Sequence, residues 1–150
     1  MRRRRSAQPA RRAGCALDEV EPRTPIAPAD IPVTITASGS YYLTGSVSIG
    51  APLGAVITID AADVSLDLNG FTIDGAGNAD FGVQITSSGG VAVKDGVVRG
   101  CVGAGVAGLT ADDVRLERLR LHNNSAENAI VRDRATLLHC NAIDKRRERL

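Results

Sequence analysis

Aromatic side chains are scarce in this sequence. Phe, Tyr and Trp make up 3% of its 150 residues, and Trp is absent. Because hydrophobic residues still account for 43%, any core has to be built from Val, Ile, Leu and Ala. Such residues in short runs, with 16 glycines to form turns, favour stacked β-strands over a helical bundle.

Paired cysteines and long apolar segments are also lacking. Cys15, Cys101 and Cys140 lie far apart, without C-x-x-C or metal-ligand spacing. Free thiols are expected, with Cys140 buried, and a single disulfide stays open as an alternative. No run of about 18 apolar residues is present, so no membrane span is expected. The arginine-rich N-terminus is not followed by the apolar region of a secretory signal.

Charge is unevenly distributed, although the formal net charge is only +1. Residues 1–24 hold seven arginines and three acids, residues 144–150 hold four bases and two acids, and residues 25–143 hold seven bases and 12 acids. An acidic body makes nucleic acid an unlikely partner. For residues 1–24 a solvated tail is favoured over a nucleic-acid-binding arm.

Composition divides the chain into four segments. Residues 1–24 lack periodicity and are predicted to be a disordered tail. Residues 25–50 are predicted to hold N-terminal cap strands; four prolines between residues 22 and 32 are expected to exclude regular structure there. Residues 51–142 form a repeat, and residues 143–150 form a charged tail without alternation.

The repeat is clearest in residues 64–75, VSLDLNGFTIDG, where apolar and polar residues alternate as in a half-buried strand. The pattern recurs at intervals of 27, 23 and 21 residues. Its central apolar positions are Leu66, Val93, Leu116 and Leu137. We align a preceding strand at Val56, Val83, Val106 and Ile130, and a following strand at Ile73, Val98, Leu121 and Ala142.

Three short strands per unit of roughly two dozen residues indicate an all-β parallel solenoid of about four coils. Stacking coils about 4.8 Å apart places equivalent residues over one another. The predicted inward columns are Leu66/Val93/Leu116/Leu137, Val64/Val91/Val114/Ala135 and Ile73/Val98/Leu121/Ala142. A helix over residues 115–121 is disfavoured, because its repeat partners contain Gly70 and Gly96.

Several runs resemble bacterial right-handed parallel β-helix proteins of the pectin-lyase-like fold. They are residues 34–48 (TITASGSYYLTGSVS), 64–75, 91–100 (VAVKDGVVRG) and 112–124 (DDVRLERLRLHNN), with 18–26 similar to the segment that precedes the solenoid. The resemblance covers roughly residues 18–142 and points to an uncharacterised secreted group. It implies a right-handed β-helix, an extracellular location and, from the wider fold, binding or cleavage of acidic polysaccharides. Against that pattern, an export signal is missing and the coils end early, so a truncated or frame-shifted end is expected.

Outward residues should also stack into columns. The first holds Asp67, Lys94 and Glu117, the second holds Asp74, Arg99 and His122, and a third holds Asn69, Asp95, Arg118 and His139. From the resemblance, the first column is a candidate substrate-binding set and the second a candidate catalytic set for uronate chemistry. A cross-strand charge ladder is the favoured interpretation, because the charges alternate in sign.

No metal site is predicted. Asp74, Asn78 and Asp80 offer oxygen atoms to Ca²⁺, but their spacing fits a plain loop better. The favoured function is a non-catalytic or truncated secreted β-helix protein whose surface contacts carbohydrate or protein. The alternative is a polysaccharide lyase or hydrolase. The open last coil is also expected to make the chain self-associate.

Overall fold

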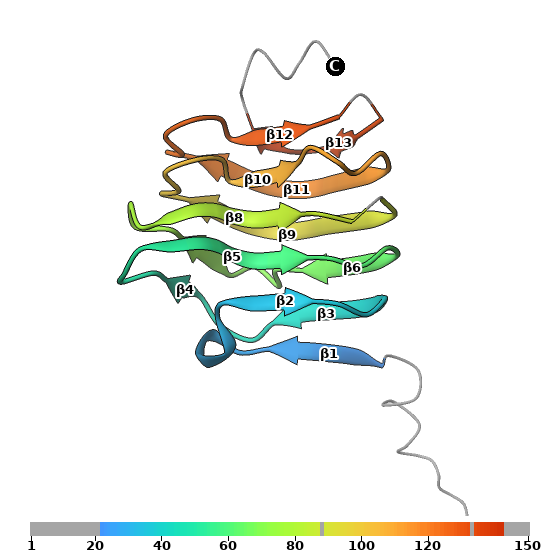
Figure 1. Ribbon diagram of the computed structural model, residues 1–150, viewed down its shortest axis with the longest axis horizontal. Helices are drawn as coiled ribbons and strands as arrows, with labels where there is room; N and C mark the ends of the chain where they lie inside the picture. Colours follow the sequence, from blue (N-terminus) through green and yellow to red (C-terminus); the bar gives the residue numbers. More distant parts are fainter. Residues whose placement is uncertain (1–21, 88, 133, 143–150) are drawn as a thin grey trace, which may run out of the picture.

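The chain winds into a parallel β-solenoid (Figure 1). The computed structural model describes residues 22–142 except 88 and 133, so residues 1–21 and 143–150 of the predicted tails lie outside it. The described elements are β1 (Arg23–Ile26), η1 (Pro28–Asp30), β2 (Val33–Ile35), β3 (Gly39–Leu43), β4 (Val47–Ser48), β5 (Leu53–Ile59), β6 (Val64–Asp67), β7 (Thr72–Asp74), β8 (Ala79–Ile85), β9 (Val91–Arg99), β10 (Val106–Gly108), β11 (Val114–His122), β12 (Ala129–Val131), β13 (Thr136–Leu138) and β14 (Asn141–Ala142).

Two parallel sheets form the walls of the solenoid. Sheet I has nine strands, in the order β1-β3-β6-β9-β11-β13, with β4, β7 and β14 paired beside this path. Sheet II has five strands, in the order β12-β10-β8-β5-β2. Figure 1 shows the strands of sheet II in front of those of sheet I, one coil above another. The predicted all-β parallel solenoid of about four coils is confirmed.

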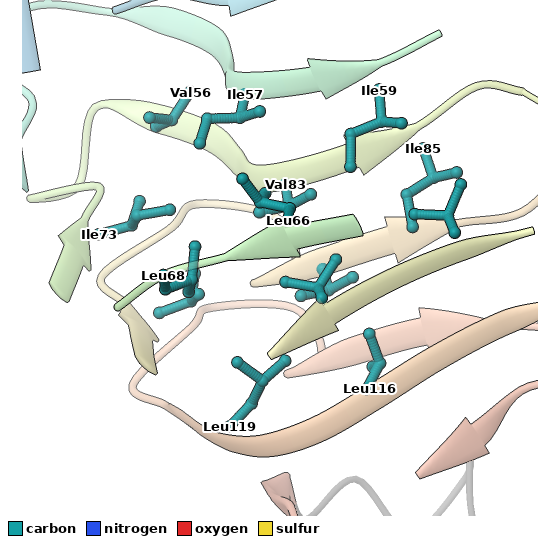
Figure 2. Packing of buried hydrophobic residues seen from close by; sticks show 14 of the residues in the cluster. Val56, Ile57, Ile59, Leu66, Leu68, Ile73, Val83, Ile85, Leu116 and Leu119 are labelled. Carbon is teal, nitrogen blue, oxygen red and sulfur yellow. The ribbon is translucent and has the colours of Figure 1, made fainter. Parts of the chain in front are cut away.

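The predicted central column is confirmed. Val93 pairs with Leu66 on one side and Leu116 on the other, and all three side chains are fully buried. Apolar side chains from both sheets fill the space between them (Figure 2). Leu137 pairs with Leu116 but is 40% exposed, because it lies in the last described coil.

The other two inward columns are also in the predicted register. Val91 pairs with Val64 and Val114. Val98 pairs with Ile73 and Leu121, and Leu121 pairs in turn with Ala142. Residues 115–121 lie within β11, so the helical alternative is excluded.

The alignment of the preceding strand was wrong in two places. Ile57, not Val56, pairs with Val83. Ala129, not Ile130, pairs with Val106. Ala129 is buried at this position, whereas Ile130 belongs to the outer face and is only half-buried.

The N-terminal segment is more regular than its prolines suggested. β1 contains Pro25 and pairs in parallel with β3, and η1 follows it. A proline is tolerated there because β1 is the outermost described strand of sheet I, where one row of N–H groups faces no other described strand. Arg23 and Thr24, which we had assigned to the tail, belong to this strand.

The predicted cap strands are continuous with the solenoid. β2 pairs with β5, β3 with β6 and β4 with β7, so residues 33–48 stack on the first repeat coil as an equivalent coil. The inward positions continue as well, since Leu43 and Val47 are buried in the same core.

The third outward column marks a bend in sheet I. Asn69, Asp95, Arg118 and His139 all have left-handed backbones, with φ of 57°, 62°, 52° and 54°. Asn and Asp tolerate this conformation better than most residues. Each coil of sheet I therefore turns at the same point of the repeat.

Candidate functional site

An open groove lies on the outer face of sheet I, across β3, β6 and β9. Its volume is about 650 Å³. The floor is formed by Ser40, Ser65 and Ala92, which pair in register on three successive coils. Small side chains at three stacked positions leave this hollow; the next position of the column is Arg115, a far larger residue.

Charged side chains form one wall of the groove. Arg23, Asp67 and Lys94 all line it. Arg23 Nη1 lies 3.4 Å from Asp67 Oδ2, and the Arg23 guanidinium lies 4.7 Å from the centre of the Tyr42 ring. Lys94 forms no ion pair with any residue that the structure describes. Its ammonium group is therefore available to an anionic ligand.

The candidate substrate-binding residues are brought into one column, but the two carboxylates of the set pair with arginines outside it. Lys94 stands between Asp67 and Glu117 in the strand register. Asp67 pairs with Arg23, and Glu117 Oε2 lies 2.9 Å from Arg118 Nη1. Glu117 does not line the groove. The functional role of this set stays a prediction.

The candidate catalytic residues share a second column, outside the groove. Arg99 is in register with Asp74 and His122. Arg99 Nη2 lies 3.2 Å from Asp74 Oδ2, while Asp74 Oδ1 accepts a hydrogen bond of 2.8 Å from the backbone N–H of Ala76. Both carboxylate oxygens thus have protein partners. Within the described part of the chain, His122 makes no side-chain hydrogen bond to either residue.

The third column contains the most extensive ion pair. Arg118 Nη2 donates to Asp95 Oδ2 at 3.0 Å, and Arg118 Nε donates to Asp95 Oδ1. These hydrogen bonds hold the pKa of the Asp95 carboxyl below its ordinary value of 3.8. The predicted charge ladder is therefore present between adjacent coils in the second and third columns.

We expect Asp95 to titrate with a midpoint below 3.8 in the folded protein. Because its folded pKa is lowered, the pair stabilises the fold above the unfolded pKa and loses this effect as pH falls through the folded value. Arg118→Ala should return the midpoint towards 3.8, as measured by NMR of the carboxyl carbon. The control is Arg132→Ala, which removes a different ion pair, with Asp112. A wild-type midpoint at or above 3.8 would contradict this assignment.

Two of the side chains considered as Ca²⁺ ligands, Asp74 and Asn78, make contacts with other residues of the protein. Asn78 Nδ2 donates to the Ile49 carbonyl at 2.9 Å, and Asp74 is engaged by Arg99. Among residues 22–142, with 88 and 133 left out, no three His, Cys, Asp or Glu side chains are grouped to hold a metal ion. These contacts give Asp74 and Asn78 a structural part in the turn.

The two described cysteines are free thiols. Cys101 is the buried one, and burial raises its thiol pKa to about 11. Cys140, which we expected to be buried, is half-buried against the core. Cys15 lies outside the described residues.

Of the residues that line the groove, sequence analysis singled out only Asp67 and Lys94 as site candidates. Ser40 and Ser65 would have been found by extending the repeat alignment back through the cap strands, which pair in register with the first coil. Arg23 carried no such signal, because its proline-containing strand does not show the alternation of the repeat.

Comparison with known proteins gives no match. No family model fits the chain, and no curated protein or solved structure shows significant similarity to it. In the part of the chain that the structure describes, no helix has the length and apolarity needed to cross a membrane.

Proposed function

We propose that this chain is a non-catalytic, secreted, pectin-lyase-like β-helix protein that holds an acidic polysaccharide in the groove on sheet I. The observation that carries the proposal is the groove itself: an open hollow of about 650 Å³, lined by Lys94, a cation that forms no ion pair with any described residue. The resemblance to pectin-lyase-like proteins supports the choice of ligand.

The floor suits a sugar chain. Three strands about 4.8 Å apart give a floor about 10 Å long between the outer strands. The Ser40 and Ser65 hydroxyls can each donate and accept hydrogen bonds with sugar hydroxyls. The Lys94 ammonium can bind a uronate carboxylate through a charge-assisted hydrogen bond.

Cations beyond the groove favour an acidic chain over a neutral one. Arg115 and Arg120 are exposed on β11, the next strand of sheet I, and neither forms an ion pair with a described residue. A polyanion leaving the groove would pass this strand. Asp63 and Asp67 also line the groove, and Asp67 is neutralised by Arg23. We therefore expect modest affinity that falls with salt.

The ion pairs favour binding over catalysis. A lyase of this kind needs a base in contact with the substrate. Arg99, the candidate base, is held by Asp74 away from the groove. Lys94 does line the groove, so a polysaccharide lyase or hydrolase is the outcome that an activity assay has to exclude.

Lys94→Ala should weaken binding of oligogalacturonate by about tenfold to about a hundredfold, because a charge-assisted hydrogen bond contributes roughly 1.5–3 kcal/mol. Isothermal titration calorimetry at low salt measures the effect. Arg132→Ala is the matched control, since it removes a cation outside the groove. Equal loss in both variants would indicate general charge attraction and contradict a site at the groove.

Activity is measured on the same ligand. Incubation with polygalacturonate and Ca²⁺ should give no unsaturated product at its ultraviolet band. Product that accumulates with the wild-type protein and disappears with Arg99→Ala or Lys94→Ala would replace the binding proposal by the lyase alternative. Absence of binding at millimolar ligand would refute both.

A further inference from the structure

Sheet II presents an outer face that is nearly free of charge. Its central outward column consists of uncharged residues in register, namely Thr34, Thr58, Gln84, Ala107 and Ile130. Among the five described strands of this sheet, the sole charged side chain is that of Asp80. The outward charges of the solenoid thus gather on sheet I and in the turns.

Exposed apolar side chains gather around this neutral face. Three large hydrophobic residues are exposed in the described part of the chain, and two of them flank β10 of sheet II: Val102, 47% exposed, and Leu109, 61% exposed. A singly exposed hydrophobic residue needs no explanation. Two such residues beside a sheet with a single charged side chain indicate a surface that another molecule covers.

A hollow of about 240 Å³ lies directly beside Leu109. Phe81, Gln84 and Ala107 from β8 and β10 line it together with Leu109, Thr86 and Thr110. The side-chain amide of Gln84 has no hydrogen-bond partner among the described residues. The same face therefore carries a projecting leucine and, next to it, an apolar hollow with one unused amide.

We propose that sheet II is the surface through which two copies of this chain associate, with Leu109 of each copy inserted into the hollow of the other. A projection and a hollow on one face are what a twofold, isologous contact requires. Residues 25–143 have five more acids than bases, although the full chain has a formal net charge of +1, so the acidic bodies of two copies repel one another where their charged faces meet. The neutral face is where that repulsion is least. This proposal is independent of the groove on sheet I.

The area of the face predicts a weak dimer. The five strands are three to seven residues long, and at 3.3 Å per residue and a spacing of about 4.8 Å they present roughly 360 Å² per copy. Both copies together would bury roughly 700 Å² of strand surface, which is below the size of most stable interfaces. Association should therefore be reversible and dependent on concentration.

Sedimentation equilibrium of the full chain, from about 10 μM to about 1 mM, should show a monomer–dimer equilibrium. Leu109→Lys should weaken the dimer at least about tenfold, because it places a charge in an apolar contact. Thr136→Lys is the matched control, since it adds the same charge at an exposed position of sheet I. This control should dimerise like the wild type.

Circular dichroism checks that each variant is folded; Leu109 is exposed, so its replacement should leave the fold intact. If Leu109→Lys does not fold, Gln84→Lys is used in its place, because it puts a charge into the same hollow and should weaken the dimer likewise. A wild-type chain that stays monomeric at the highest concentration would overturn the proposal. A dimer that persists in Leu109→Lys would overturn it too, and would place association elsewhere, such as the last coil.

Discussion

Leu66→Ala should lower the free energy of unfolding by about 2–5 kcal/mol. The Leu66 side chain is fully buried and lies between Tyr41 and Val93 of the adjacent coils. A cavity at this position is enclosed by rigid β-ladders on both sides, so the surroundings have little freedom to collapse. Urea denaturation followed by circular dichroism measures the loss.

Leu137→Ala is the control within the same column. Leu137 is 40% exposed, so the same truncation removes far less buried surface and should cost under about 1 kcal/mol. Equal losses for the two variants would show that burial does not differ along the column, contrary to the structure.

Gly96→Ala should destabilise the protein by about 1–3 kcal/mol or more, although it adds only a methyl group. A Cβ atom at Gly96 would lie 2.8 Å from Leu68 Cδ1 and 2.9 Å from the Phe71 carbonyl oxygen, and closer still to Leu68 Cβ. The previous coil occupies this space with a fully buried leucine. The loss would come from overpacking between coils.

Gly54→Ala provides a control of opposite sign. Gly54 lies in β5, and a Cβ atom there would have no neighbour within 4 Å. Alanine should be neutral or stabilise by up to about 1 kcal/mol, because it restricts the unfolded chain. Thermal unfolding of both variants distinguishes the cases; a tolerated Gly96→Ala would mean that β9 does not approach Leu68 and Phe71 of the previous coil as described.

The fold could be predicted because the repeat encodes both faces of each strand. The apolar side chains of Leu66, Val93 and Leu116 occupy matching positions in the alternating pattern, and a slip of one residue would turn every one of them outward. This constraint allowed the three inward columns to be predicted from the sequence. It also excluded a helix at β11, whose glycine-containing partners in the repeat do not favour one.

The error at Val56 has a specific cause. The pairs Ala55 with Phe81 and Ile57 with Val83 place Val56 opposite Gly82. Val56 and Ile57 are both buried, so alternation is lost there and two registers fit the pattern. Matching Val56 to Val83 gave the wrong register, because the residue equivalent to Val56 in the next coil is Gly82. A larger residue does not fit there, since a Cβ atom at Gly82 would clash with Val98.

The candidate site was predicted only in part. Register alone placed Asp67 beside Lys94, and Asp74 beside Arg99. The groove depends instead on the small side chains of Ser65 and its neighbours in the column. It also depends on β1, which was not predicted as a strand because it contains a proline. The ion-pair partner of Asp67 was unpredictable for a similar reason, since Asp67 pairs with Arg23 of that strand and not with the lysine next to it.

Methyl–methyl nuclear Overhauser effects in the isotope-labelled full chain test the stacking of coils most directly. We predict cross-peaks that link Leu66 to Val93 and Val93 to Leu116, residues adjacent on neighbouring strands but far apart in sequence. Absence of these cross-peaks, together with sequential amide contacts typical of a helix through residues 115–121, would contradict the solenoid and everything inferred from its two faces.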